Sequence, residues 1–76
     1  MTEQEWLTIF SCNLAEMLKE SGMTQAELAE EAGLSYASVN YYIRGCKVPG
    51  ARALINIAHV FGCRVDDLVD FGSMIY

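Results

Sequence analysis

The side chains best suited to bind a partner lie close together in residues 35–44, SYASVNYYIR. At helical spacing, one face of this segment presents hydroxyl, amide and aromatic groups. The outward residues are Tyr36, Ala37, Ser38, Asn40, Tyr41 and Arg44. Such groups suit phosphate oxygens, the edges of bases and thymine methyl groups. The segment therefore indicates a nucleic-acid-binding surface.

The charge distribution supports this interpretation, although the chain as a whole is acidic. Ten acidic and five basic side chains give a net charge of −5, which normally disfavours a polyanionic partner. Residues 35–53, however, hold Arg44, Lys47 and Arg52 and no acid, so this window alone carries a charge of +3. The cationic window thus contains the polar face.

No other set of side chains has the spacing of a catalytic or metal site. His59 and Cys63 are four residues apart, and Cys12 and Cys46 are the remaining thiols. A zinc site needs about four converging ligands, which this pattern does not supply. The single histidine has no identifiable orienting acid or nucleophile. We therefore expect no metal, no cofactor, no small-molecule site and no enzymatic activity.

The composition predicts one small domain over residues 1–76. Hydrophobic residues make up 53% of the chain, which suffices for a compact core. Three cysteines cannot all pair internally and none lies in a CxxC motif, which favours a reducing compartment. No apolar run has the length of a membrane helix or a secretory signal, so we expect a cytoplasmic protein without a membrane partner.

Helices must position the candidate site. Thr2 with Glu5, and Thr24 with Glu27, form the pattern of a capping box at a helix start, and Ser35 is the expected N-cap of a third helix. The predicted helices span about 3–21, 25–32, 36–44, 51–61 and 65–71. No segment alternates with a period of two over more than four residues. The predicted fold class is therefore all-α, with five helices.

Apolar residues at helical spacing predict the core. They are Trp6, Phe10, Leu14, Met17, Leu18, Leu28, Ala29, Ala32, Val39, Tyr42, Ile43, Leu54, Ile57, Ala58 and Phe61. Because Tyr41 and Tyr42 are adjacent, only one of them can face outward, and the helical phase places Tyr42 inside.

Residues 24–44 have the length and the turn of a helix-turn-helix unit, with Gly33-Leu34-Ser35 between two short helices. The linked signals are Gly22-x-Thr24-Gln25-x-x-Leu28-Ala29, Gly33-Leu34-Ser35-x-x-x-Val39, Gly45-x-x-x-Pro49, Ala58-x-x-Phe61-Gly62 and Leu68. At these spacings the chain resembles the lambda-repressor-like, Cro-type helix-turn-helix family, often called the XRE family. The resemblance covers about residues 11–71, with 1–10 as an N-terminal helix extension and 72–76 as a C-terminal tail.

The resemblance implies a compact five-helix domain that binds double-stranded operator DNA, usually as a dimer, with the third helix in the major groove. It implies base contacts from Tyr36, Ala37 and Tyr41. It implies contacts to the DNA backbone from Gln25, Ser35, Ser38, Asn40, Arg44 and Lys47. The alternatives are an ordinary solvated role for Gln25 and an exposed or partner-facing role for Tyr36.

The chain also departs from the family pattern. Many members carry an arginine where Leu18 stands and a glutamate where Ile43 stands, and these form a buried ion pair. A well-packed apolar pair can equal such an ion pair in stability, so we expect Leu18 and Ile43 to touch in the core. The loop after the third helix retains Lys47 beside Cys46 and Val48, which lowers the expected DNA affinity.

The two ends of the chain are apolar and allow two interpretations. Trp6 lies near the start, and Phe71, Met74 and Ile75 lie near the end. These residues could pack against one another within one chain, or they could form a homodimer interface. The two-fold symmetry of operators favours the dimer.

The sequence thus predicts a sequence-specific DNA-binding transcriptional regulator, and specifically a repressor. A protein-interaction module on the same fold, without significant DNA binding, is the alternative suggested by the acidic helices.

Overall fold

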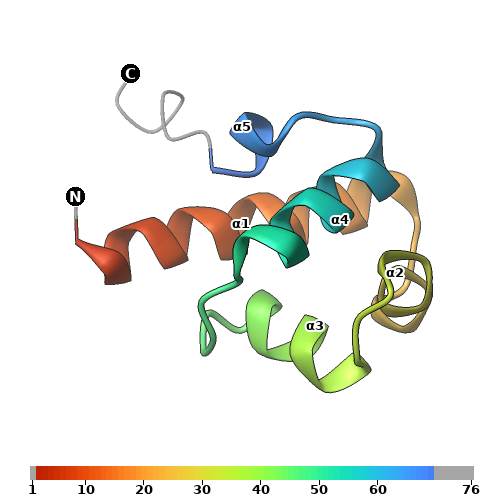
Figure 1. Cartoon of the computed structure of the whole chain (residues 1–76), viewed down its shortest axis with the longest axis horizontal. Coiled ribbons are helices and arrows are strands. Elements are labelled where there is room, and N and C mark those ends of the chain that lie inside the picture. The colour runs from red at the N-terminus through yellow and green to blue at the C-terminus, as the bar shows by residue number, and fades with distance from the viewer. Residues whose placement is uncertain (1, 70–76) are drawn as a thin grey trace.

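The structure is a computed structural model that describes residues 2–69, and this part of the chain is all-helical. Its elements are α1 (Glu3–Ser21), α2 (Gln25–Ala32), α3 (Tyr36–Ile43), α4 (Ala51–Phe61) and α5 (Val65–Leu68). Figure 1 shows α1 running the length of the molecule between α3 and α5, with α2 at one end. The predicted all-α fold with five helices is confirmed. Within residues 2–69, no helix is long and apolar enough to cross a membrane.

The predicted capping boxes begin the first two helices. Thr2 Oγ1 accepts a hydrogen bond from the Glu5 N–H at 3.1 Å, while Glu5 Oε1 accepts from the Thr2 N–H at 2.9 Å. Thr24 and Glu27 repeat this arrangement with the same two distances. Each box satisfies amide groups that a helix start would otherwise leave without partners. Local sequence therefore determines where α1 and α2 begin.

Two predicted helix ends are wrong. The third helix ends at Ile43 instead of Arg44, because Gly45 adopts φ +71° and the chain turns there. The N–H of Cys46 then donates a hydrogen bond to Tyr41 O, and the N–H of Gly45 donates one to Tyr42 O. These two hydrogen bonds are the pair that defines a Schellman motif at a helix C-terminus.

The fifth helix ends at Leu68, three residues before the predicted end. The side chain of Asn13 donates to Leu68 O at 2.9 Å, so an α1 residue satisfies the last carbonyl of α5. Phe71, the predicted last residue of this helix, lies outside the described residues.

The core lies where all five helices meet. Its fully buried side chains are Phe10, Leu14, Leu28, Val39, Ile57 and Leu68. Five residues predicted to be inside are only half-buried and pack against this cluster: Trp6, Met17, Ile43, Leu54 and Phe61. Trp6 lies near the start of α1, and Ile43 and Phe61 are the last residues of α3 and α4, where fewer helices surround a side chain.

Part of the Trp6 side chain packs within the molecule. Its ring stacks on that of Phe10, with centroids 5.8 Å apart and planes 13° from parallel. It is half-buried, so some of its surface remains available to a partner. The other three residues of the predicted dimer interface, Phe71, Met74 and Ile75, lie outside the described residues.

Candidate nucleic-acid interface

The outer face of α3 presents the three residues predicted to contact bases. Tyr36 is 56% exposed, Tyr41 is 45% exposed, and Ala37 is exposed between them. Tyr42, the neighbour of Tyr41, is 4% exposed and packs edge-on against Phe10, with ring centroids 5.9 Å apart. The predicted phase of α3 is confirmed, so one face of this helix is free and the other is anchored in the core.

A tight turn joins α2 to α3. Gly33 ends α2 with φ +68°, a conformation that residues with a Cβ rarely adopt. The N–H of Leu34 bonds to Ala29 O at 2.8 Å, and Leu34 packs half-buried against the core. Ser35 then caps α3, its Oγ accepting from the Ser38 N–H at 3.0 Å. The two helices are thus held at a defined angle, as a helix-turn-helix unit requires.

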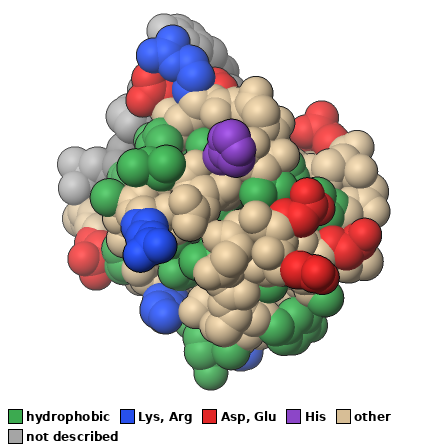
Figure 2. Space-filling model, turned by 45° about the vertical axis from the view of Figure 1, so that its right-hand side comes forward, with side chains coloured by type: hydrophobic (Ala, Val, Ile, Leu, Met, Phe, Trp, Pro, Cys, Tyr) green, Lys and Arg blue, Asp and Glu red, His purple; other side chains and the backbone are tan. Residues whose placement is uncertain are grey.

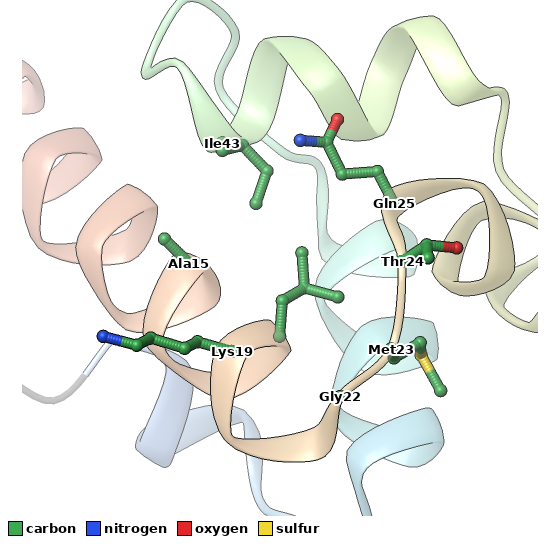
Figure 3. A pocket seen from close by; sticks show the side chains of 8 residues that line it. Ala15, Lys19, Gly22, Met23, Thr24, Gln25 and Ile43 are labelled. Atoms are coloured by element: carbon green, nitrogen blue, oxygen red, sulfur yellow. The ribbon is translucent and has the colours of Figure 1, made fainter.

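Gln25 and Asn40 connect the start of α2 to the middle of α3. Asn40 Nδ2 donates to Gln25 Oε1 at 3.1 Å, and both side chains are half-buried. Figure 3 shows the Gln25 side chain extending from α2 toward α3. Because Gln25 accepts through its oxygen, its amide nitrogen is left to donate elsewhere. Two residues predicted to contact the DNA backbone therefore also hold the two helices together.

A series of side-chain hydrogen bonds joins the start of α3 to the loop that follows this helix. Ser35 Oγ donates to Ser38 Oγ at 2.9 Å, and Lys47 Nζ donates to the same Ser38 oxygen at 3.3 Å. The Lys47 ammonium also lies 5.9 Å from the centre of the Tyr42 ring, over its face. Ser38 accepts from both neighbours, so its own proton is left to donate. Three predicted backbone-contact residues are thus brought together.

Among the residues that the structure describes, the cations near α3 have no acidic partners. Within residues 2–69 the one ion pair joins Arg64 to Asp66 on α5, at 3.3 Å. Arg44, Lys47 and Arg52 are exposed, and no acidic residue occurs between Glu31 and Asp66. In Figure 2 a cluster of acidic side chains lies on the right, while lysine and arginine side chains lie on the left and at the top, where some acidic side chains are also visible. The charge around α3 is therefore available to a polyanion.

The exposed acids of α2 form a separate group: Glu27, Glu30 and Glu31. Of these, Glu27 has a lowered pKa, because the Thr24 backbone N–H and hydroxyl hydrogen-bond to its carboxylate. Glu5 has a lowered pKa for the same reason at the start of α1. Both carboxylates therefore hold a proton less tightly than an ordinary glutamate does.

Ser11 is a positioning residue that the sequence analysis missed. It is 8% exposed, and its Oγ lies 2.8 Å from Leu7 O and 2.9 Å from Tyr42 O. The second contact connects α1 to the last turn of α3. Gly45 comes so close that a Cβ there would lie 3.1 Å from the Ser11 hydroxyl. A polar residue between Leu7 and Leu14 on the buried stripe of α1 was the signal for this role.

Asn56 has a similar role at the end of α2. Its Nδ2 donates to Ala32 O at 3.2 Å across 24 residues of sequence. The C-terminal carbonyls of both α2 and α3 are thus satisfied by side chains from other helices. Nothing in the spacing of Asn56 distinguishes it from a solvated residue, so sequence reasoning had no signal for this contact.

A hollow of about 490 Å³ opens between the end of α1, the start of α2 and the end of α3. It is lined by Ala15, Leu18, Lys19, Gly22, Met23, Thr24, Gln25 and Ile43. Leu18 is buried and Ile43 is half-buried, so both replacements of the family's ion pair face the same space. Figure 3 shows Ile43 reaching from α3 toward Ala15 on α1. A direct contact between Leu18 and Ile43 stays a prediction.

The three cysteines are free thiols. Cys12 and Cys46 are exposed, and Cys63 is half-buried. Burial raises the pKa of the Cys63 thiol, and the nearby Asp67 carboxylate raises it further. Within residues 2–69, no group of three or more His, Cys, Asp or Glu side chains is placed to hold a metal ion.

Comparison with known proteins identifies this arrangement. A family model described as helix-turn-helix matches residues 14–68. A relative in Archaeoglobus fulgidus, described as an uncharacterized HTH-type transcriptional regulator, is 34% identical over 58 residues, covering 76% of this chain and 83% of the relative. The solution structure of the SOS-response transcriptional repressor LexA from Eubacterium rectale is similar with a TM-score of 0.84 at 28% identity, covering 92% of this chain and 74% of that one. The chain belongs to the XRE-type helix-turn-helix family of DNA-binding transcriptional regulators.

Proposed function

We propose that this protein is a cytoplasmic, sequence-specific repressor that reads the major groove of double-stranded DNA with α3 and acts as a homodimer. The observation that carries the proposal is the free outer face of α3, flanked by the unpaired cations Arg44, Lys47 and Arg52. A helix with its side chains is about 10–12 Å across, which matches the width of the major groove, about 12 Å.

In this arrangement the two sets of side chains have different tasks. Tyr36, Ala37 and Tyr41 face the bases and select the sequence. Gln25, Ser35, Ser38, Asn40, Arg44 and Lys47 lie toward phosphates and set the register of α3 along the groove. The free Gln25 amide nitrogen, the Ser38 proton and the Lys47 ammonium are donors, as phosphate oxygens require. Their internal hydrogen bonds hold them in place before DNA arrives.

The similarity to a LexA repressor supports repression over activation. The apolar residues Trp6, Phe71, Met74 and Ile75 supply the proposed dimer interface. Dimerisation would join two recognition helices and so match a two-fold symmetric operator.

Selection from a random duplex library at low salt tests the proposal. We expect enrichment of an inverted repeat whose half-sites are one helical turn apart, together with dimers at tens of micromolar in sedimentation. Enrichment of a single half-site with monomers only would contradict the dimer. If no sequence is enriched, the proposal that α3 reads DNA is wrong. The acidic surface of α2 would then indicate a protein partner instead.

A further inference from the structure

The outer face of α3 lacks the side chains that discriminate best between guanine and adenine. Guanine is read most often by a bidentate arginine or lysine, and adenine by a bidentate asparagine or glutamine. The exposed positions of the first and middle turns are occupied instead by Tyr36, Ala37 and Tyr41. None of these three carries a guanidinium, an ammonium or an amide.

The polar side chains elsewhere on α3 are engaged or lie at its end. Asn40 supplies the one side-chain amide of the helix, and its Nδ2 donates to Gln25 on α2, which draws it away from the outer face. Ser38 bonds to Ser35 and Lys47. Arg44 follows the last helical residue, as the C-cap. The side chains left for the bases are therefore chiefly apolar.

Ala37 and Tyr41 are four residues apart and so form one continuous strip on the helix surface. A methyl group beside an aromatic ring suits one feature of the major groove, the 5-methyl group of thymine. The tyrosine hydroxyl both donates and accepts hydrogen bonds, so by itself it discriminates weakly between bases.

We infer that this protein selects its operator through thymine 5-methyl groups, which contact the strip formed by Ala37 and Tyr41. The inference rests on the proposed function, since it specifies which feature of the DNA the same face reads. Burying one methyl group contributes an amount that corresponds to about a fourfold change in affinity. Two or three such contacts per half-site would therefore produce substantial specificity without a bidentate hydrogen bond.

Replacement of thymine by deoxyuridine tests this inference, because it removes the 5-methyl group and leaves base pairing unchanged. The duplex is the sequence enriched by selection, and each thymine of one half-site is replaced in turn. We expect one to three positions at which the dissociation constant rises about fourfold. An enriched sequence that is indifferent to every replacement, or one whose essential pairs are all G·C, would overturn the inference while leaving DNA binding intact. If selection enriches nothing, the proposed function fails and the inference falls with it.

Protein variants assign the effect to the strip. In Tyr41→Ala, replacing thymine by deoxyuridine at the position that Tyr41 contacts should no longer raise the dissociation constant. Tyr41→Phe keeps the ring, so in that variant the replacement should still raise it. Ile55→Ala is the matched control, because Ile55 is a comparably exposed apolar residue on α4, at 58%. Circular dichroism verifies that each variant is folded. If Tyr41→Ala and Ala37→Gly both retain every penalty, the strip does not read the methyl groups.

Discussion

Asn40 Nδ2 donates to Gln25 Oε1 at 3.1 Å, so one hydrogen bond joins the first residue of α2 to the middle of α3. Both residues are also expected to lie toward phosphates. A contact that holds α2 and α3 at a fixed angle therefore involves two side chains that we propose to lie against DNA. Removal of either partner should affect stability and affinity together.

A double-mutant cycle measures this relationship. We expect Gln25→Ala and Asn40→Ala each to lower the free energy of unfolding by about 1 kcal/mol, and the double variant to lose clearly less than the sum, because both remove the same bond. Chemical denaturation provides the measurement. Gln4→Ala, on the exposed surface of α1, is the control and should have little effect. Strictly additive losses would show that the bond contributes nothing.

Arg44 should contribute to DNA binding without contributing to sequence choice. Three unpaired cations per chain give about six in a dimer, so log Kd against log salt concentration should have a slope of magnitude about 5. Arg44→Ala should weaken binding to all sequences alike and reduce that magnitude by about 2, since a dimer loses two cations. Titrations of operator and unrelated duplexes across a salt series measure both effects.

Arg64→Ala is the control for this experiment, because Arg64 already pairs with Asp66 at the start of α5. The slope should remain unchanged in that variant. If Arg44→Ala loses affinity for the selected operator but not for unrelated duplexes, Arg44 contacts bases instead of the DNA backbone.

The start of α2 should make stability sensitive to acid. Hydrogen bonds from Thr24 lower the pKa of Glu27 below the ordinary value of 4.5, so the folded state holds this proton less tightly than the unfolded state. The stabilisation is therefore present above the unfolded pKa and is lost as the pH falls through the folded pKa. Thr24→Ala, which removes the cap, should cost about 1 kcal/mol at neutral pH.

Denaturation at several pH values between about 3 and about 7 tests the sign of this effect. Glu27→Gln keeps an acceptor for the Thr24 N–H but cannot ionise, so part of the acid-induced loss of stability should disappear. Glu30→Gln is the control on the same helix. An unchanged pH profile in Glu27→Gln would show that the Thr24–Glu27 pair does not respond to protonation.

The two apolar replacements of the family's ion pair should contribute unequally. Leu18 is 7% exposed, and Leu18→Ala should lower the free energy of unfolding by about 2–4 kcal/mol. Ile43 is half-buried at the mouth of the hollow, and Ile43→Ala should cost about half as much because water already reaches part of its side chain. Ile55→Ala should stay within about 0.5 kcal/mol. Equal losses for Leu18→Ala and Ile43→Ala would show that the hollow closes in solution.

The sequence by itself determined the features that depend on neighbours along the chain. The starts of α1 and α2 followed from threonine and glutamate residues three apart, whose mutual hydrogen bonds form inside a single turn. The choice of Tyr42 over Tyr41 for the core followed from helical phase alone. The family followed from spacings that span most of the chain, and the comparisons confirm it.

The tertiary structure alone decided how the helices lie against one another. Ser11 bonds to Tyr42 O across 31 residues, Asn56 to Ala32 O across 24 and Asn40 to Gln25 across 15. A local pattern can mark one member, as the polar Ser11 on the buried stripe of α1, but it does not identify the partner, because the geometry of the pair depends on where two separate helices meet. The end of α5 likewise involves a distant residue, since Asn13 on α1 donates to its final carbonyl. Helix type and phase are local properties of this chain, whereas the placement of α3 for binding depends on packing between distant residues.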